Sequence, residues 1–191
     1  MKGLDYLDTI YHAIVNEHPI QLKYRSFKAR SANNFIFYPY LLKEYRNRWF
    51  VYGVRGNGRI LQNLALDRIQ SLEVLPQEHY IKNTFFDPNT FFDDLVGVTK
   101  NSGSVAEKVG FKVAAAEAPY IITKPIHRSQ QVVERLADGS VILEIEVVIN
   151  HELEQVFFGY AEGIHVLYPK TLVELMGRKL KKAAEQYTHS K

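Results

Sequence analysis

Arginine and aromatic residues are concentrated in residues 21–70, and these side chains can hold phosphates and stack on bases. This stretch has ten Lys and Arg against two Asp and Glu, a balance of +8. The other 141 residues have fourteen against nineteen, a balance of −5, which together give the net charge of +3. The pattern predicts a surface for nucleic acid or nucleotides, and it is equally compatible with a solvated basic face that binds neither.

The candidate ligand contacts lie in or beside predicted strands of this stretch. Alternate side chains of a strand share a face, so Arg48 and Tyr52 would lie on one side and Trp49 on the other. For Trp49 the alternative is core packing, and for Asp67 with Arg68 it is a structural ion pair. The residues that we predict to contact a ligand here are Tyr24, Arg25, Arg48, Trp49, Tyr52, Arg59, Asp67 and Arg68.

A second polar cluster occupies residues 125–130, between a predicted helix and a predicted strand. His127, Arg128 and Gln130 are further candidate ligand contacts. The alternative is that these residues only cap a loop.

Several kinds of catalytic chemistry have no motif in this sequence. The absence of cysteine excludes disulfides, thiolate zinc sites and cysteine nucleophiles. The sequence has no glycine-rich phosphate loop, no metal-spaced histidine pair and no nucleophile elbow. We therefore expect a protein that is not an enzyme and has neither a metal nor another cofactor.

The composition is that of a folded protein without a membrane partner. Hydrophobic residues make up 46% of the 191 residues, enough to bury a sizeable core. The longest apolar runs are interrupted by charges, well short of the roughly 20 apolar residues of a membrane span. The N-terminus contains acidic residues where a signal peptide would be apolar. We expect a cytoplasmic protein.

Residues 1–76 are predicted to form a helix followed by a small barrel. Apolar residues at helical spacing before Pro19 predict a linker helix over residues 1–18. Alternating patterns and the turns at Arg46-Asn47 and 56–58 then predict a five-stranded antiparallel β-barrel over residues 19–76. Its predicted strands are Ile20–Phe27, Phe35–Glu44, Trp49–Val54, Leu61–Ala65 and Ile69–Leu75.

The remainder is predicted to be a connecting segment and a second domain. Residues 77–104 are rich in turn-forming residues and would include one short helix, Pro88–Val96. Residues 105–191 follow the order strand, helix, strand, strand, helix, strand, which is typical of a ferredoxin-like fold, and end in a helix. Asp138-Gly139 is the predicted hairpin turn between the two central strands. The predicted elements are Val109–Ala114, Glu117–Lys124, Gln130–Leu136, Val141–Ile149, a helix from Asn150 or His151 to Glu162, Ile164–Tyr168 and Lys170–Tyr187. The fold class is therefore α+β.

The barrel residues resemble a known family. Trp49-Phe50-Val51 is similar to the Trp-Tyr-Leu signature of WYL domains, with Phe and Val in place of its Tyr and Leu. Tyr24, Pro39 and Leu66-Asp67-Arg68-Ile69 follow the family pattern in order and spacing. The later part resembles the family's C-terminal extension, at His127-x-Ser129-Gln130, Gly163 and Val166-Leu167-Tyr168-Pro169-x-x-Leu172, so that the resemblance covers about residues 10–187.

This resemblance implies a regulatory module of bacterial transcription factors, with an Sm-like barrel that senses a ligand. It implies as effector a single-stranded nucleic acid or a phosphate-bearing nucleotide, bound by basic residues of the barrel. Family members typically have a helix-turn-helix domain before the barrel, whereas one helix precedes the first predicted strand here. We expect either part of a longer regulator or a stand-alone sensor, and a homodimer is one oligomeric state open to it. The alternative function is a protein-interaction module with a basic docking face.

Overall fold

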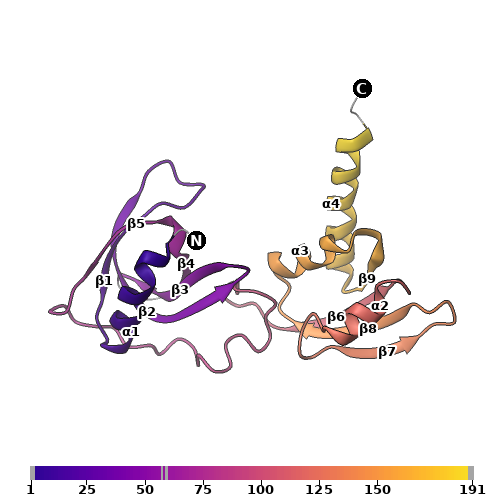
Figure 1. Ribbon diagram of the computed structural model, residues 1–191, viewed down its shortest axis with the longest axis horizontal. Helices are drawn as coiled ribbons and strands as arrows, with labels where there is room; N and C mark the ends of the chain where they lie inside the picture. The colour runs from indigo at the N-terminus through magenta and orange to yellow at the C-terminus, as the bar shows by residue number, and fades with distance from the viewer. Residues whose placement is uncertain (1–2, 57, 59, 189–191) are drawn as a thin grey trace. The chain divides into compact units, whose positions relative to one another are not determined.

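The chain forms two compact units, each built around one antiparallel sheet. A computed structural model describes residues 3–56, 58 and 60–188 (Figure 1). The units are Met1–Phe91 and Phe92–Lys191, with a five-stranded sheet in the first and a four-stranded sheet in the second. The mixed helix and strand class predicted from the sequence is confirmed. The division between the units falls inside the predicted connecting segment 77–104.

The first unit contains the helix and the five strands that the sequence predicts. Its elements are η1 (Leu4–Tyr6), α1 (Leu7–Val15), β1 (Ile20–Tyr24), β2 (Asn33–Tyr45), β3 (Arg48–Arg55), β4 (Leu61–Ala65), η2 (Leu66–Arg68) and β5 (Ile69–Val74). The strands pair in the order β4-β3-β2-β1-β5. The first strand ends at Tyr24 and not at Phe27, because its ladder with β5 becomes irregular between Lys23 and Tyr24. Residues after Tyr24 therefore form a loop.

The connection between β4 and β5 requires the sheet to curl. These strands lie at opposite edges of the sheet, yet only Leu66–Arg68 joins them. Four strand spacings would separate the edges of a flat sheet by about 19 Å. The four steps from Ala65 to Ile69 reach at most about 15 Å, and less in a 3₁₀ turn. The two edges are thus drawn together, and Asp67 and Arg68 lie where they meet.

The core of the first unit includes the N-terminal helix. Ile10 of α1 is fully buried, together with Leu22, Phe37 and Val51 from the sheet. Trp49 is half-buried and packs against the same cluster. The helix that we predicted as a linker therefore packs into the core of the first unit.

The segment after β5 packs on the first unit but contains no helix. Tyr80 donates a hydrogen bond to the Pro39 carbonyl, and the rings of Tyr40 and Phe85 stack with centroids 6.3 Å apart. The helix predicted at Pro88–Val96 is wrong, since this stretch forms only consecutive turns. Its Phe, Thr and Asp residues are weak helix formers, and the carboxylates of Asp93 and Asp94 are paired elsewhere.

The second unit follows the predicted order of strands and helices. Its elements are β6 (Glu107–Val113), α2 (Ala118–Thr123), β7 (Gln131–Arg135), β8 (Val141–Val147), α3 (His151–Gly159), η3 (Ala161–Gly163), β9 (Ile164–Tyr168) and α4 (Lys170–Thr188). The strands pair in the order β7-β8-β6-β9, and all neighbours are antiparallel. The core includes Phe111, Leu143 and Phe157.

Local signals in the sequence set the turns and caps of these elements. Arg46 and Asn47 have φ of 48° and 60°, as a two-residue hairpin turn with the twist of its strands requires. Gly139 has φ of 82° at the β7–β8 turn. Asn150 caps α3 by accepting a hydrogen bond from the Leu153 N–H at 2.8 Å. Each of these turn and cap positions was predicted from its residue types.

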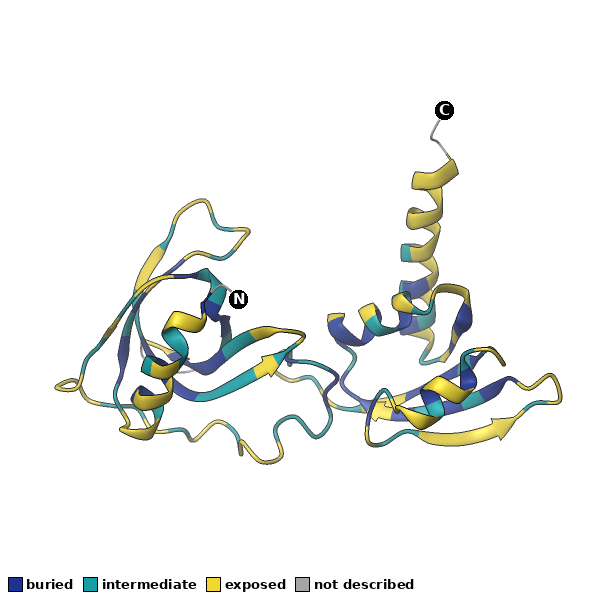
Figure 2. Ribbon diagram, in the orientation of Figure 1, coloured by how far each residue is buried: buried dark blue, intermediate teal, exposed yellow. Residues whose placement is uncertain are grey.

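Burial within the second unit is uneven along α4. Leu172 and Met176 are buried at its base, whereas the following turns are largely exposed (Figure 2). In the described part of the chain, no helix is both long and apolar enough to cross a membrane.

The close approach of β2 to Gly53 of β3 can be tested by substitution. A Cβ at this position would lie 2.1 Å from the Tyr38 carbonyl oxygen and 2.7 Å from the Phe37 ring. We expect Gly53→Ala to destabilise the first unit by about 3 kcal/mol, because backbone and a buried ring cannot yield cheaply. The unfolding midpoint in urea, followed by the fluorescence of the single tryptophan, Trp49, measures this.

Gly177 of α4 is the control for that substitution, since a Cβ there meets nothing within 4 Å. Gly177→Ala should leave the Trp49 transition unchanged. An unaltered transition in Gly53→Ala as well would contradict the close packing described for β2 and β3.

Candidate ligand-binding site

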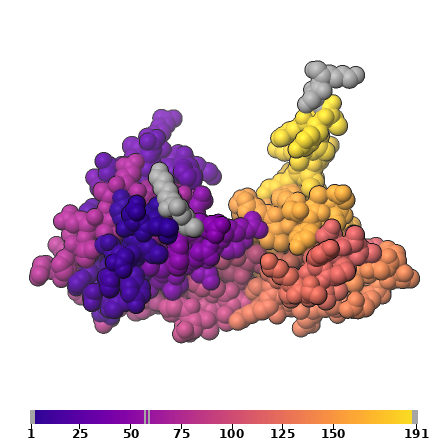
Figure 3. Space-filling model, viewed as in Figure 1, coloured from indigo at the N-terminus to yellow at the C-terminus, as the bar shows by residue number. Residues whose placement is uncertain are grey.

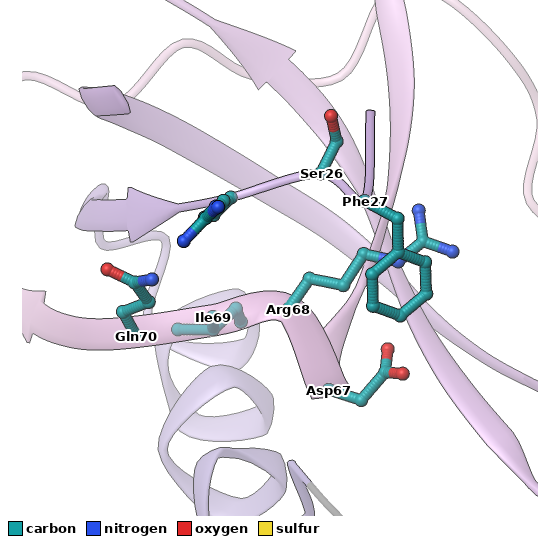
Figure 4. Close-up of a pocket in the computed structure, with 7 residues that line it drawn as sticks. Ser26, Phe27, Asp67, Arg68, Ile69 and Gln70 are labelled. Carbon is teal, nitrogen blue, oxygen red and sulfur yellow. The ribbon is translucent and has the colours of Figure 1, made fainter. Parts of the chain in front are cut away.

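A pocket of about 290 Å³ lies where the edges of the first sheet approach each other (Figure 4). Its walls are the segment after β1 and the junction of η2 with β5. A hydrogen bond joins these two walls, donated by the Arg25 N–H to the Arg68 carbonyl at 3.2 Å. Three predicted ligand residues, from distant parts of the chain, are thus brought together. The lining residues are Arg25, Ser26, Phe27, Asp67, Arg68, Ile69 and Gln70.

Arg68 is held against an exposed aromatic ring. Its guanidinium carbon lies 4.4 Å from the centroid of the Phe27 ring, and Figure 4 shows the ring alongside the end of the Arg68 side chain. Phe27 is 74% exposed, which is unusual for so large an apolar side chain. Arg68 Nε is buried and has no hydrogen-bond partner among the described residues. Buried polar atoms without a partner are uncommon, and a bound ligand is one way to satisfy them.

Asp67 pairs with Arg48 of β3 across the junction. Arg48 Nε lies 3.4 Å from Asp67 Oδ2, and the Asp67 side chain is only 15% exposed. The structural ion pair considered for Asp67 is therefore made with Arg48 and not with its neighbour Arg68. Since Arg48 balances Asp67, the pocket keeps the positive charges of Arg25 and Arg68, neither of which has an ion-pair partner in the described chain.

Tyr24 is buried next to this pocket. It is 8% exposed, and its ring contacts Phe35 edge-on at 6.5 Å. Burial raises the pKa of the Tyr24 phenol, and the nearby Arg68 guanidinium partly opposes this. The phenol is thus neutral at ordinary pH and supports Arg68 from the core side.

Two further predicted residues of the first unit pack inside it. Trp49 packs against the core of the first unit, as the alternative interpretation proposed. Tyr52 is 2% exposed, and its ring meets Phe91 edge-on at 5.8 Å. The Tyr52 ring is therefore not accessible to a ligand, because the segment after β5 covers it. Arg59 lies outside the described residues.

His127 and Gln130 of the second unit are used within their own loop. His127 is buried, and its Nδ1 accepts a hydrogen bond from the Ser129 N–H at 3.2 Å. The Gln130 amide accepts from the Ile126 N–H at 3.0 Å and donates to the Ile121 carbonyl at 2.9 Å. Gln130 therefore ties the end of α2 to the following loop, which agrees with the loop-cap alternative.

Arg128 is the exposed member of the second cluster. Its Nη2 lies 2.6 Å from Asp93 Oδ2, at the edge of an open hollow of about 450 Å³. Asp94 and Glu146 also line this hollow, so carboxylates outnumber cations there. Its charge does not favour an anionic ligand. In the described part of the chain, no group of three or more His, Cys, Asp or Glu side chains could hold a metal ion.

Phe27 is the site residue that the sequence interpretation missed. We had placed it at the end of a predicted strand, where an aromatic ring would pack inward. The signal that could have identified it is its position between Arg25 and Lys28, since basic and aromatic residues alternate in groove-forming loops.

The buried His127 predicts a pH dependence of the second unit's stability. Burial, followed by repulsion from Arg128, lowers the pKa of His127 below 6.5, although the Asp93 backbone and the nearby carboxylates partly oppose this. The unfolded chain therefore binds the proton more readily, so stability falls as the pH drops below about 6.5 and the loss ends below the folded-state pKa. We expect His127→Gln to weaken this dependence, measured by far-UV circular dichroism melts between pH 7.5 and 5 (a range set by the ordinary histidine pKa of about 6.5).

His165→Gln is the control, since this histidine is exposed on β9 and should leave the pH profile unchanged. A His127→Gln profile as steep as that of the unmodified chain would refute the assignment.

Comparison with known proteins identifies the two units. The family model of the WYL domain matches residues 5–74, and that of the WCX domain matches residues 106–184. No curated protein matches the chain.

Two solved structures are similar over 97% of this chain. One is proteasome accessory factor B/C (PafBC) of Arthrobacter aurescens, at 17% identity and a TM-score of 0.37, and the other is a CRISPR Cas-related protein, at 13% and 0.55. The chain spans 27% and 53% of their lengths, and the second likeness is one of fold alone. The two family matches confirm the earlier resemblance: the chain belongs to the WYL-domain family, with a WYL domain in its first unit and a WCX domain in its second.

Proposed function

We propose that this chain is the effector-sensing module of a transcriptional regulator, and that the pocket between β1 and η2 binds a short single-stranded nucleic acid or a phosphate-bearing nucleotide. WYL and WCX domains together support a regulatory role. Because the chain spans only part of the two similar structures, the proposal assigns DNA binding to another domain of a longer protein. The chain acts by binding and not by catalysis.

The observation that carries this proposal is the pairing of two uncompensated arginines with an exposed aromatic ring in one pocket. Arg25 and Arg68 supply guanidinium groups, which suit phosphate oxygens. Phe27 presents to solvent a ring whose position is already set by its contact with Arg68. Stacking of one base on such a ring contributes about 1–3 kcal/mol. One nucleotide could therefore use all three side chains.

The other predicted residues have different roles in this proposal. Arg48 and Asp67 position the η2 turn and do not bind phosphate. Tyr24 positions Arg68 from the core side of the pocket. His127, Arg128, Gln130 and Tyr52 are left out of the ligand contacts, because their polar groups or rings are already used within the chain.

The strand orders support finer assignments of the two folds. A five-stranded sheet ordered β4-β3-β2-β1-β5, with its edges drawn together by η2, fits an Sm-like barrel. The order β7-β8-β6-β9, with α2 and α3 as the connecting helices, fits a ferredoxin-like fold. An Sm-like barrel with a basic pocket at its edge agrees with a nucleic-acid ligand.

Substitution of Phe27 and Arg68 tests the proposal directly. Labelled DNA and RNA oligonucleotides, and labelled nucleotides, would be titrated with the chain and followed by fluorescence anisotropy. We expect Phe27→Ala to weaken binding by about 5- to 150-fold, the equivalent of one lost stacking contact. Arg68→Ala should weaken it and also reduce its salt dependence, because one phosphate contact is lost.

The chain offers a matched control for each substitution. Arg135→Ala removes the same charge from an exposed position on β7 of the second unit. Tyr11→Ala removes an exposed aromatic ring from α1. If a variant and its control lose the same amount of binding affinity, the pocket is not the binding site.

The same titrations separate the alternatives. Salt-sensitive binding of acidic proteins, with no oligonucleotide or nucleotide bound, would favour the protein-interaction module. Turnover of any nucleotide, with or without Mg²⁺, would overturn the claim that the chain only binds.

A further inference from the structure

The exposed half of α4 carries an unpartnered apolar seam. Val173, Met176, Leu180, Ala183 and Tyr187 follow the 3-4-3-4 spacing of a coiled coil. The first two pack in the core of the second unit, whereas Leu180 is 40% exposed and Tyr187 is 85% exposed. Figure 3 shows the last turns of α4 projecting from the rest of this unit. One continuous seam thus begins in the core and runs out into solvent.

A small cavity lies at the base of this seam and opens on the same face of α4. It has a volume of about 140 Å³, with Val173, Met176, Gly177 and Leu180 of α4 and Phe157 of α3 among its walls. Apolar cavities of about 150 Å³ bind a benzene ring. The cavity is thus of a size for one aromatic side chain.

Gly177 keeps the cavity accessible. Glycine is a poor residue for a helix interior, yet it stands here in the middle of the longest helix. A Cβ at this position would meet nothing within 4 Å, so no contact inside the chain requires glycine. A larger side chain would project into the cavity mouth.

We propose that a second copy of this chain docks antiparallel along α4 and inserts its Tyr187 into this cavity. In an antiparallel coiled coil the two kinds of seam position face each other, which places Leu180 opposite Ala183 of the second copy. The same register places Tyr187 of the second copy opposite Met176, at the cavity. His165 in the cavity wall offers a partner for the tyrosine hydroxyl. The arrangement is two-fold symmetric, so both cavities are filled.

The charges of α4 permit this pairing. Arg178, Lys181, Lys182 and Glu185 occupy heptad positions on the side away from the seam. Lys179, at the edge of the seam, is paired with Glu154 of α3. In the proposed register Lys179 faces Gln186 of the second copy, so no like charges oppose each other. A second copy therefore fits this face better than an acidic partner would, because the basic residues point away from it.

Sedimentation velocity of the full chain over about 10–1,000 µM tests the association, since an interface this short predicts a weak dimer. We expect Tyr187→Ala to raise the dimer dissociation constant at least about tenfold, as for a buried aromatic anchor. Tyr187→Phe should stay within about twofold because the ring is kept. Tyr187 is exposed in the single chain, so these variants should fold normally.

Lys182→Ala is the matched control, since it truncates a long exposed side chain on the opposite face of the same helix. It should dimerise at least as well as the unmodified chain. A monomer throughout the concentration range, or equal weakening by Lys182→Ala and Tyr187→Ala, would overturn the proposal.

The register is tested by crosslinking, which is clean because the chain has no cysteine. Leu180→Cys and Ala183→Cys variants of different mass would be mixed and oxidised. The antiparallel seam predicts that the disulfide between the two different variants exceeds both disulfides between identical variants. An excess of the identical pairs would refute it.

Discussion

The short connection from β4 to β5 is the constraint on which the candidate site depends. Three residues join strands at opposite edges of a five-stranded sheet, so the sheet has to curl until those edges approach. The same three residues supply Asp67 and Arg68. The turn that draws these edges together therefore also supplies two of the residues that line the pocket. Arg25 and Arg68 line one cavity because β1 pairs with β5 as far as Tyr24 and Ile69, which places the residues just beyond that pair side by side.

The arginines of the first unit have two different roles, one in an ion pair and one in the pocket. Arg48 approaches Asp67 and balances its partly buried carboxylate, whereas Arg25 and Arg68 keep their charge toward the pocket. An exposed phenylalanine against Arg68 gives that pocket an aromatic side. Within the described residues, Asp67 Oδ1 and Arg68 Nε are buried without a hydrogen-bond partner, which a well-packed structural turn would avoid.

The second unit shows a different use of polar residues. Asn150 caps α3 and also donates to the carbonyls of Val96 and Thr99, and Gln130 joins α2 to its loop in the same way. The hydrogen bonds of these side-chain amides stabilise the fold. The unit's surface instead offers an apolar seam on α4, with the basic residues turned away from it. The charged pocket of the first unit and the apolar seam of the second are thus chemically different surfaces.

Residue patterns by themselves determined the order of elements and the location of most turns. Strand alternation, the helical spacing of apolar residues and pairs such as Asp138-Gly139 act over a few residues, so they can be interpreted without the fold. They also located the basic, aromatic stretch and the family resemblance. They failed at Pro88–Val96, where packing and ion pairs outweighed a weak local preference for helix.

Only the tertiary structure decided which of those residues form a site. Periodicity cannot show that Arg48 neutralises Asp67, that Tyr52 is covered by a later segment or that Phe27 lies outside its strand. Each outcome depends on where distant parts of the chain meet. A side chain's role as ligand contact or as packing is set by its burial and by its partners, and these exist only once the chain has folded.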